Sequence, residues 1–132
     1  NTYSLETTIA EKIDAILSLM EFSSRMKDYY DIYYLANKFD FDGKILTEAL
    51  KKTFANRGHS FTVEQFGQVL TFGSDDAMQK KWKAFCKKID TKTDDYNTVL
   101  RTIKAFLTKP FTATVEDNLF TATWTAQNGR WK

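Results

Sequence analysis

The sequence contains few of the residues that cross-link a chain or interrupt its helices. It has one cysteine, one proline and five glycines among 132 residues. A single cysteine, Cys86, excludes an internal disulfide, and its lysine-rich surroundings lack the spacing of a metal or redox motif. We expect Cys86 to be a small buried side chain. The scarcity of glycine and proline favours helices.

Long apolar runs are also lacking. No stretch approaches the roughly 18 consecutive apolar residues of a membrane-spanning helix. The first residues show no basic segment followed by an apolar one, as a secretory signal would. We therefore expect no membrane partner and a cytoplasmic location. The chain begins at Asn1 and enters an amphipathic pattern by Ser4, so we expect a piece of a longer protein.

The sequence is rich in apolar and aromatic residues at helical spacing. Its apolar fraction is 42% and its aromatic fraction 15%, and its length fits one domain with one core. We predict a mainly α fold, a bundle of about six helices in a single domain over residues 1–132. The expected helices cover residues 5–20, about 24–38, a segment from Asp42 to Gly58, a segment from Thr62 to Leu70, residues 75–89, and a segment that begins after Asp94 or Asp95 and ends before Pro110.

The last part of the chain has a different pattern. From Phe120 to Ala126, apolar residues alternate with threonines, which is typical of a strand. Asn128-Gly129 is a favoured hairpin turn, but only three residues follow it. We predict a short hairpin or an extended C-terminal segment that packs on the helices through its tryptophans.

The segment around residues 25–31 places two basic and two acidic residues before a very aromatic run. On a helix, Arg25 and Asp28 are three residues apart, and Lys27 and Asp31 are four apart, so ion pairs within the helix explain the charges without a function. The aromatic neighbours predict burial, and buried charged groups are paired, hydrogen-bonded or functional. Spacing alone leaves both interpretations open.

Two motifs in combination carry a family resemblance. The first is Tyr3-x-Leu5-Glu6-Thr7-x-x-Ala10-Glu11-Lys12-Ile13-x-Ala15, and the second is Ser24-Arg25-x-Lys27-Asp28-x-Tyr30-Asp31. Weaker similarity continues through Ala49-x-x-x-Thr53-Phe54-x-x-Arg57 and Trp82-x-x-Phe85. The chain resembles the AbiEii and AbiGii toxin nucleotidyltransferases, a family known from phage abortive infection and toxin–antitoxin operons.

The resemblance implies a split active site. The family's glycine-serine and Asp-x-Asp motifs, which hold the phosphates and the metal, have no match here. Gly73-Ser74 lacks the strand that precedes the family's motif and the acidic pair that follows it, so we interpret these two residues as helix capping. Magnesium is implied as the cofactor, with its ligands mostly outside this chain. The implied partners are a nucleoside triphosphate, a candidate RNA acceptor and a cognate antitoxin, and we expect the chain alone to be inactive.

The resemblance also implies roles for individual residues. Lys12, Asp28 and Asp31 are the expected catalytic residues, with Asp28 ranked above Asp31. Lys12, Arg25 and Lys27 are the expected nucleotide-binding residues, and we assign no metal ligand. Lys12 suits the triphosphate as a point charge. The adjacent Glu11 is expected to form an ion pair that supports its helix.

Two alternative functions remain. The chain could be a helical interaction domain that binds a protein partner such as an antitoxin. It could also be a nucleic-acid-binding module that uses the lysines between Lys80 and Lys92. Trp82 lies on the apolar stripe, which predicts a core residue and a solvated lysine face. His59 has no second histidine or cysteine nearby in sequence, so we expect a loop histidine rather than a metal ligand.

Overall fold

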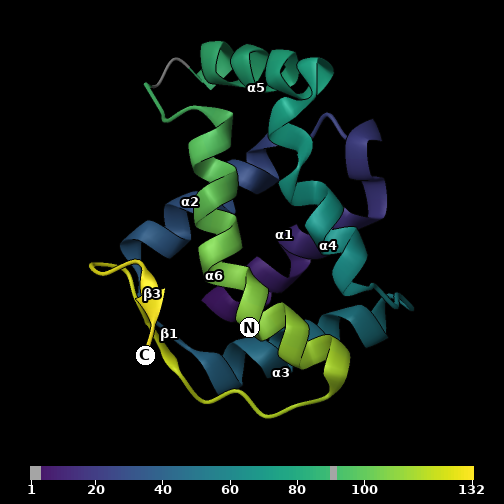
Figure 1. Ribbon diagram of the computed structural model, residues 1–132, viewed down its shortest axis with the longest axis vertical. Helices are drawn as coiled ribbons and strands as arrows, with labels where there is room; N and C mark the ends of the chain where they lie inside the picture. The colour runs from purple at the N-terminus through teal and green to yellow at the C-terminus, as the bar shows by residue number, and fades with distance from the viewer. Residues whose placement is uncertain (1–3, 90–91) are drawn as a thin grey trace.

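The computed structural model describes residues 4–89 and 92–132. Within them the chain is mainly α-helical, as predicted, with a small antiparallel sheet near the C-terminus (Figure 1). The helices are α1 (Leu5–Leu19), α2 (Met26–Lys38), α3 (Gly43–Asn56), α4 (Val63–Leu70), α5 (Asp76–Ile89) and α6 (Tyr96–Glu116), with short 3-10 helices η1 (Met20–Phe22) and η2 (Phe72–Ser74).

Most helix starts are fixed by the side chains that the sequence indicated. Ser4 accepts a hydrogen bond from the Thr7 backbone N–H, and Asp42 accepts from Lys44 and Ile45. Thr62 and Gln65 form the complete capping box. Each cap satisfies backbone donors that the first turn of a helix leaves without partners. Asp95 starts α6 in the same way, which decides between the two predicted caps.

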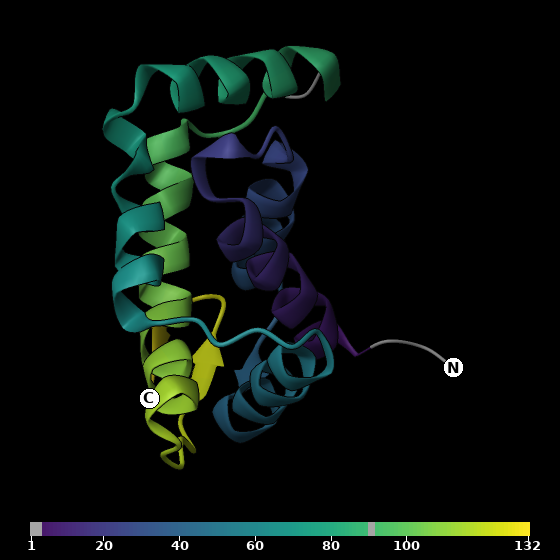
Figure 2. The same cartoon turned by 90° about the vertical axis from the view of Figure 1, so that its right-hand side faces the viewer.

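Helix α6 is the central element of the bundle. It packs against α2, α3 and α4, while α1 packs against α2 and α3. Helix α5 lies across one end of the molecule, next to the turn between α1 and α2 (Figure 2). The core contains the apolar stripes of all six helices together with two tryptophans from the C-terminal segment. No described helix is both long and apolar enough to cross a membrane.

The C-terminal segment forms the predicted hairpin and also pairs with a third strand. Strands β2 (Thr123–Thr125) and β3 (Arg130–Trp131) are antiparallel, and β2 also pairs with β1 (Phe41–Asp42). Trp124 lies opposite Phe41 on one side and Trp131 on the other. Strand β1 was not predicted, because two residues are too few to show strand periodicity.

Pro110 contradicts one prediction, because α6 continues through it to Glu116. A proline inside a helix has no N–H, so it leaves the carbonyl four residues earlier without its usual partner. Here that carbonyl belongs to Phe106, and the indole N–H of Trp131 donates to it at 2.8 Å. The hairpin thus supplies the donor that the proline lacks. This compensation comes from a residue 25 positions away in sequence.

A Trp131→Phe substitution is expected to lower the free energy of unfolding by roughly 1–3 kcal/mol, because it keeps an aromatic ring but leaves the buried Phe106 carbonyl unpaired. Urea unfolding monitored by circular dichroism measures this change. In a Pro110→Ala background the restored backbone N–H can bond to Phe106, so the cost should shrink. An equal cost in both backgrounds would contradict the proposed compensation.

Candidate functional site

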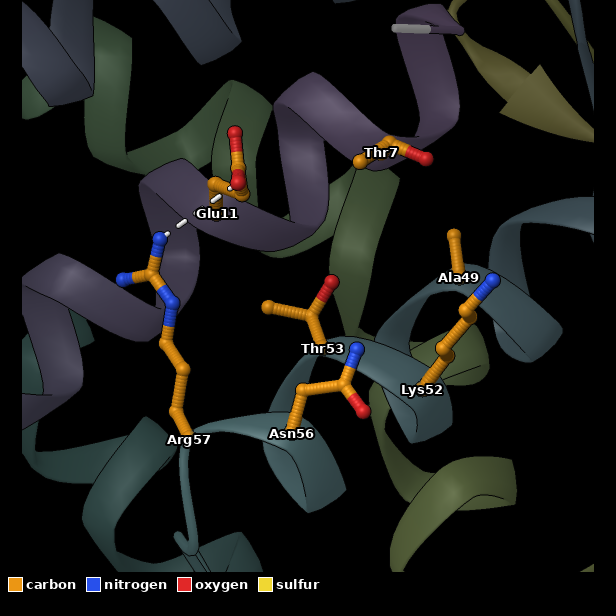
Figure 3. A pocket seen from close by; sticks show the side chains of 7 residues that line it. All are labelled: Thr7, Glu11, Ala49, Lys52, Thr53, Asn56 and Arg57. Atoms are coloured by element: carbon orange, nitrogen blue, oxygen red, sulfur yellow. Dashed lines mark hydrogen bonds and ion pairs between the residues drawn. The ribbon is translucent and has the colours of Figure 1, made fainter.

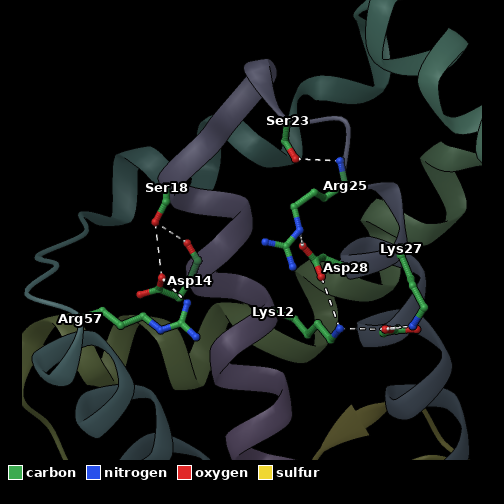
Figure 4. A network of polar contacts seen from close by, with 9 residues as sticks. Lys12, Asp14, Ser18, Ser23, Arg25, Lys27, Asp28 and Arg57 are labelled. Atoms are coloured by element: carbon green, nitrogen blue, oxygen red, sulfur yellow. Dashed lines mark hydrogen bonds and ion pairs between the residues drawn. The ribbon is translucent and has the colours of Figure 1, made fainter.

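Lys12 lies between two carboxylates of the neighbouring helix. It projects from α1 toward α2, where its Nζ is 3.4 Å from Asp28 Oδ1 and 3.0 Å from Asp31 Oδ2 (Figure 4). The two acids share one face of α2 because they are three residues apart. The structure therefore brings together the three residues expected to be catalytic.

The two remaining predicted residues complete a charged cluster of five. Arg25 Nε is 3.1 Å from Asp28 Oδ2, and Lys27 Nζ is 2.8 Å from Asp31 Oδ2. Both pairs that the spacing indicated at the start of α2 are thus present. Arg25 and Lys27 are largely exposed, with 58% and 70% of their side chains accessible, whereas Asp28 is only 2% exposed. We call Lys12, Arg25, Lys27, Asp28 and Asp31 the charged cluster.

Asp28 is a buried carboxylate with incomplete hydrogen bonding. Its Oδ2 is buried and has no hydrogen-bond partner with acceptable geometry among the described residues, although Arg25 Nε is close to it. A buried polar atom in this condition is costly.

Lys12 keeps its positive charge at neutral pH. Partial burial alone would lower its pKa, but the hydrogen bond and negative charge of Asp31, together with Asp28, outweigh that effect and raise the pKa above 10.5. Stability contributed by this shift is present below the unfolded pKa and is lost only as the pH rises through the higher folded value. At physiological pH the cluster thus contains a fixed cation between two acids.

The other side of α1 is attached to the end of α3. Asp14 is buried in α1, and its carboxylate is 3.3 Å from Arg57 Nη1 and 2.8 Å from His59 Nδ1. Arg57 also pairs with Glu11, which confirms the supporting role expected for that acid. Sequence reasoning missed Asp14 and treated His59 as solitary. The sequence signal for this site was Asp14 itself, an acidic residue among the buried apolar residues of α1.

Comparison with protein-family models identifies a match over most of the chain. The model described as nucleotidyl transferase AbiEii toxin, type IV TA system, matches residues 1–116. The chain belongs to the AbiEii family. A search among curated proteins and a search among solved structures found no match. A type IV toxin–antitoxin family implies a cognate antitoxin as partner.

The AbiEii match covers both motifs that carry the resemblance, and it ends at the last residue of α6. Tyr3, the first residue of the first motif, lies outside the described residues. The weaker motif at Thr53, Phe54 and Arg57 has a structural explanation, because Phe54 is in the core and Arg57 pairs with α1. Strands β2 and β3 follow the matched region.

The charged cluster does not fit a magnesium ion. Three cations and two carboxylates leave it with a net positive charge, and an ammonium group already lies between the two acids. Magnesium prefers carboxylate and water oxygens in an octahedral arrangement. No group of three or more histidine, cysteine or acidic side chains suitable for a metal is found among the described residues. A positive cluster instead favours an anion such as a phosphate.

A hollow of about 350 Å³ lies on another side of α1, between α1 and α3 (Figure 3). Thr7 and Glu11 of α1 line one wall, and Lys52, Asn56 and Arg57 line the other. Lys12 and Asp28 are not part of this lining. We place the candidate site at the charged cluster, because it contains the five residues that the resemblance assigns to catalysis and nucleotide binding, and none of the five lines the hollow.

The other sequence candidates have structural roles. Trp82 is buried, and its indole N–H donates to the Asp94 carbonyl, which confirms the prediction of a core residue. Gly73 and Ser74 form part of η2, and Asp75 next to them caps α5 through the Met78 N–H. His59 lies in a connection, as expected, but it bonds to Asp14. Cys86 is half-buried rather than fully buried.

Proposed function

We propose that this chain is the C-terminal helical part of a nucleotidyltransferase toxin, and that the charged cluster forms one wall of its nucleotide site. The observation that carries the proposal is the position of Lys12, a fixed cation held between Asp28 and Asp31. Family membership supports the reaction class. We also propose that the reaction takes place in the cytoplasm and that RNA is the acceptor.

In nucleotidyl transfer, an acceptor hydroxyl attacks the α-phosphorus of a nucleoside triphosphate. A new oxygen–phosphorus bond forms, the hydroxyl proton passes to a base, the bond to the bridging oxygen breaks, and pyrophosphate leaves with its negative charge. A positioned cation stabilises this developing charge. Lys12 is assigned that role, while Arg25 and Lys27 extend the positive surface toward solvent as nucleotide-binding residues.

The two acids are assigned to hold Lys12 in place and to complete the catalytic centre. Asp28 is fixed by burial and by its contacts with α1 and Arg25. Its Oδ1 is 3.4 Å from Lys12 Nζ and its Oδ2 is 3.1 Å from Arg25 Nε, so it holds a cation on each side. Asp31 holds Lys12 at 3.0 Å and is itself held by Lys27. Magnesium ligands and the phosphate-binding glycine-serine motif are proposed to lie outside this chain.

The proposal is tested with the full-length protein, labelled nucleoside triphosphates and cellular RNA. Label is expected to pass to RNA from at least one triphosphate when magnesium is present. Removal of magnesium by a chelator is expected to abolish the transfer, and the 132-residue chain alone should transfer nothing. Absence of transfer by the full-length protein with every triphosphate would contradict the proposed function.

A further inference from the structure

Lys81 of α5 is bound to the turn between α1 and α2. Its Nζ donates hydrogen bonds to the backbone carbonyls of Glu21 and Ser23, both at 2.9 Å. Carbonyl groups at the end of a helix lack partners within the helix, and a lysine side chain can supply the missing donor. None of the ion pairs found in residues 4–89 and 92–132 involves Lys81. Its ammonium group therefore serves the turn and not an acid.

The turn that Lys81 holds does not follow a relaxed helical path. Met20, at the end of α1, has a φ of 51°, which is costly for a residue with a Cβ. Arg25, the N-cap residue of α2, caps that helix with no side-chain hydrogen bond. The two hydrogen bonds from Lys81 thus help to fix the path by which the chain enters α2.

Ser23 links Lys81 to Arg25. Ser23 is only 2% exposed, and its carbonyl and hydroxyl groups have different partners. The carbonyl accepts from Lys81, while Oγ accepts a hydrogen bond from the Arg25 backbone N–H at 2.9 Å (Figure 4). Arg25 in turn has its Nε 3.1 Å from Asp28 Oδ2. A continuous series of contacts therefore joins α5 to the charged cluster.

The side chain of Arg25 depends on the position of its backbone. It is 58% exposed, so packing restricts it little, and fixing such a side chain costs conformational entropy. Arg25 pairs with Asp28 through Nε, and no contact found in residues 4–89 and 92–132 uses its two terminal nitrogens. The backbone of Arg25 therefore decides where these two nitrogens can meet a ligand.

We infer that Lys81 is a positioning residue of the nucleotide site. By holding Ser23, it places Arg25 so that the guanidinium group can bind a phosphate of the nucleoside triphosphate, and Lys81 itself does not touch the nucleotide. A guanidinium group binds phosphate through directed hydrogen bonds, so its affinity depends on its position more than that of a point charge does. The inference rests on the proposed function, in which Arg25 is a nucleotide-binding residue.

Lys81→Met in the full-length protein removes the donor to both carbonyls but keeps most of the side-chain stem. The KM for the transferred nucleoside triphosphate is expected to rise about tenfold, a usual cost of losing one hydrogen bond to a charged group, while kcat changes much less. A general loss of folded protein would instead lower kcat and leave KM unchanged. Lys80→Met is the matched control: it replaces the preceding, exposed lysine of α5 and should change neither value.

A double variant shows whether Lys81 acts through Arg25. Arg25→Ala alone should raise KM at least as much as Lys81→Met does. Lys81→Met combined with Arg25→Ala should raise KM no further than Arg25→Ala alone, because Lys81 then has no guanidinium group left to position. A wild-type KM in Lys81→Met, or a double variant in which the two single effects multiply, would overturn the inference.

Hydrogen exchange of the full-length protein without substrate gives a readout that needs no activity. A peptide covering residues 23–28 should exchange roughly tenfold faster in Lys81→Met than in the wild type, because the turn is less firmly held. Lys80→Met should exchange as the wild type does. Absence of transfer by the wild type would contradict the proposed function, whereas normal transfer with unchanged exchange and KM in Lys81→Met would contradict this inference alone.

Discussion

Replacing Lys12 with alanine in the full-length protein is expected to reduce nucleotide transfer roughly 10²–10³-fold, the usual loss when one group that stabilises transition-state charge is removed. The structure places this cation between Asp28 and Asp31, where its pKa is raised and its charge is maintained. Transfer of labelled nucleotide to RNA measures the effect. Asp28→Ala is expected to cause a comparable loss.

Stability should change little in these variants. Without Asp28, Lys12 retains Asp31, and the largely exposed Arg25 side chain can be hydrated. Without Lys12, Asp28 retains Arg25 and Asp31 retains Lys27.

Lys51→Ala is the matched control: it removes a lysine that pairs with an aspartate, Asp117, outside the charged cluster, and it should leave transfer unchanged. Full activity in both the Lys12 and Asp28 variants, with unchanged thermal unfolding, would show that the charged cluster is structural.

Replacing Trp124 with alanine is expected to lower the free energy of unfolding by about 3–5 kcal/mol, as for other large buried aromatic side chains. Trp124 is almost fully buried and packs against Phe106 and Trp131. Its indole N–H also donates to the Ala36 carbonyl at 2.8 Å. That carbonyl belongs to the last turn of α2, where helical carbonyls lack partners within the helix. Chemical unfolding measures the loss.

Trp124→Phe separates packing from hydrogen bonding. It keeps much of the ring but removes the donor to Ala36, so the expected loss is smaller, about 1–3 kcal/mol. If the alanine variant unfolds with the same free energy as the wild type, the C-terminal segment does not contribute to the core in solution.

The local structure of this protein was largely predictable from its sequence. Helix starts depend on a few neighbouring residues, so Ser4, Asp42 and Thr62 could be identified as caps without knowledge of the fold. The apolar spacing predicted six helices, and Asn128-Gly129 predicted the hairpin turn. The two pairs at the start of α2, Arg25 with Asp28 and Lys27 with Asp31, follow from spacing alone.

The candidate site was predictable only in part. Spacing within 25–31 favoured a solvated ion-paired face over a functional site. The resemblance of the two motifs reversed that preference and added Lys12 as a further member. The structure brings Lys12 to the two acids of α2. The pairing of Asp14 with Arg57 and His59 was not predictable, because 43 and 45 residues separate the partners and no local pattern relates them.

The sequence by itself determined the helices, their caps and the family. Tertiary structure decided how far α6 extends, because Pro110 is accommodated by a donor from the distant Trp131. It also decided which charges are buried, since the low exposure of Asp28 depends on the packing of α1 against α2. The physical reason is the same in both cases: capping and periodicity depend on residues within one or two turns, whereas partners for buried polar groups come from any segment that packing brings close.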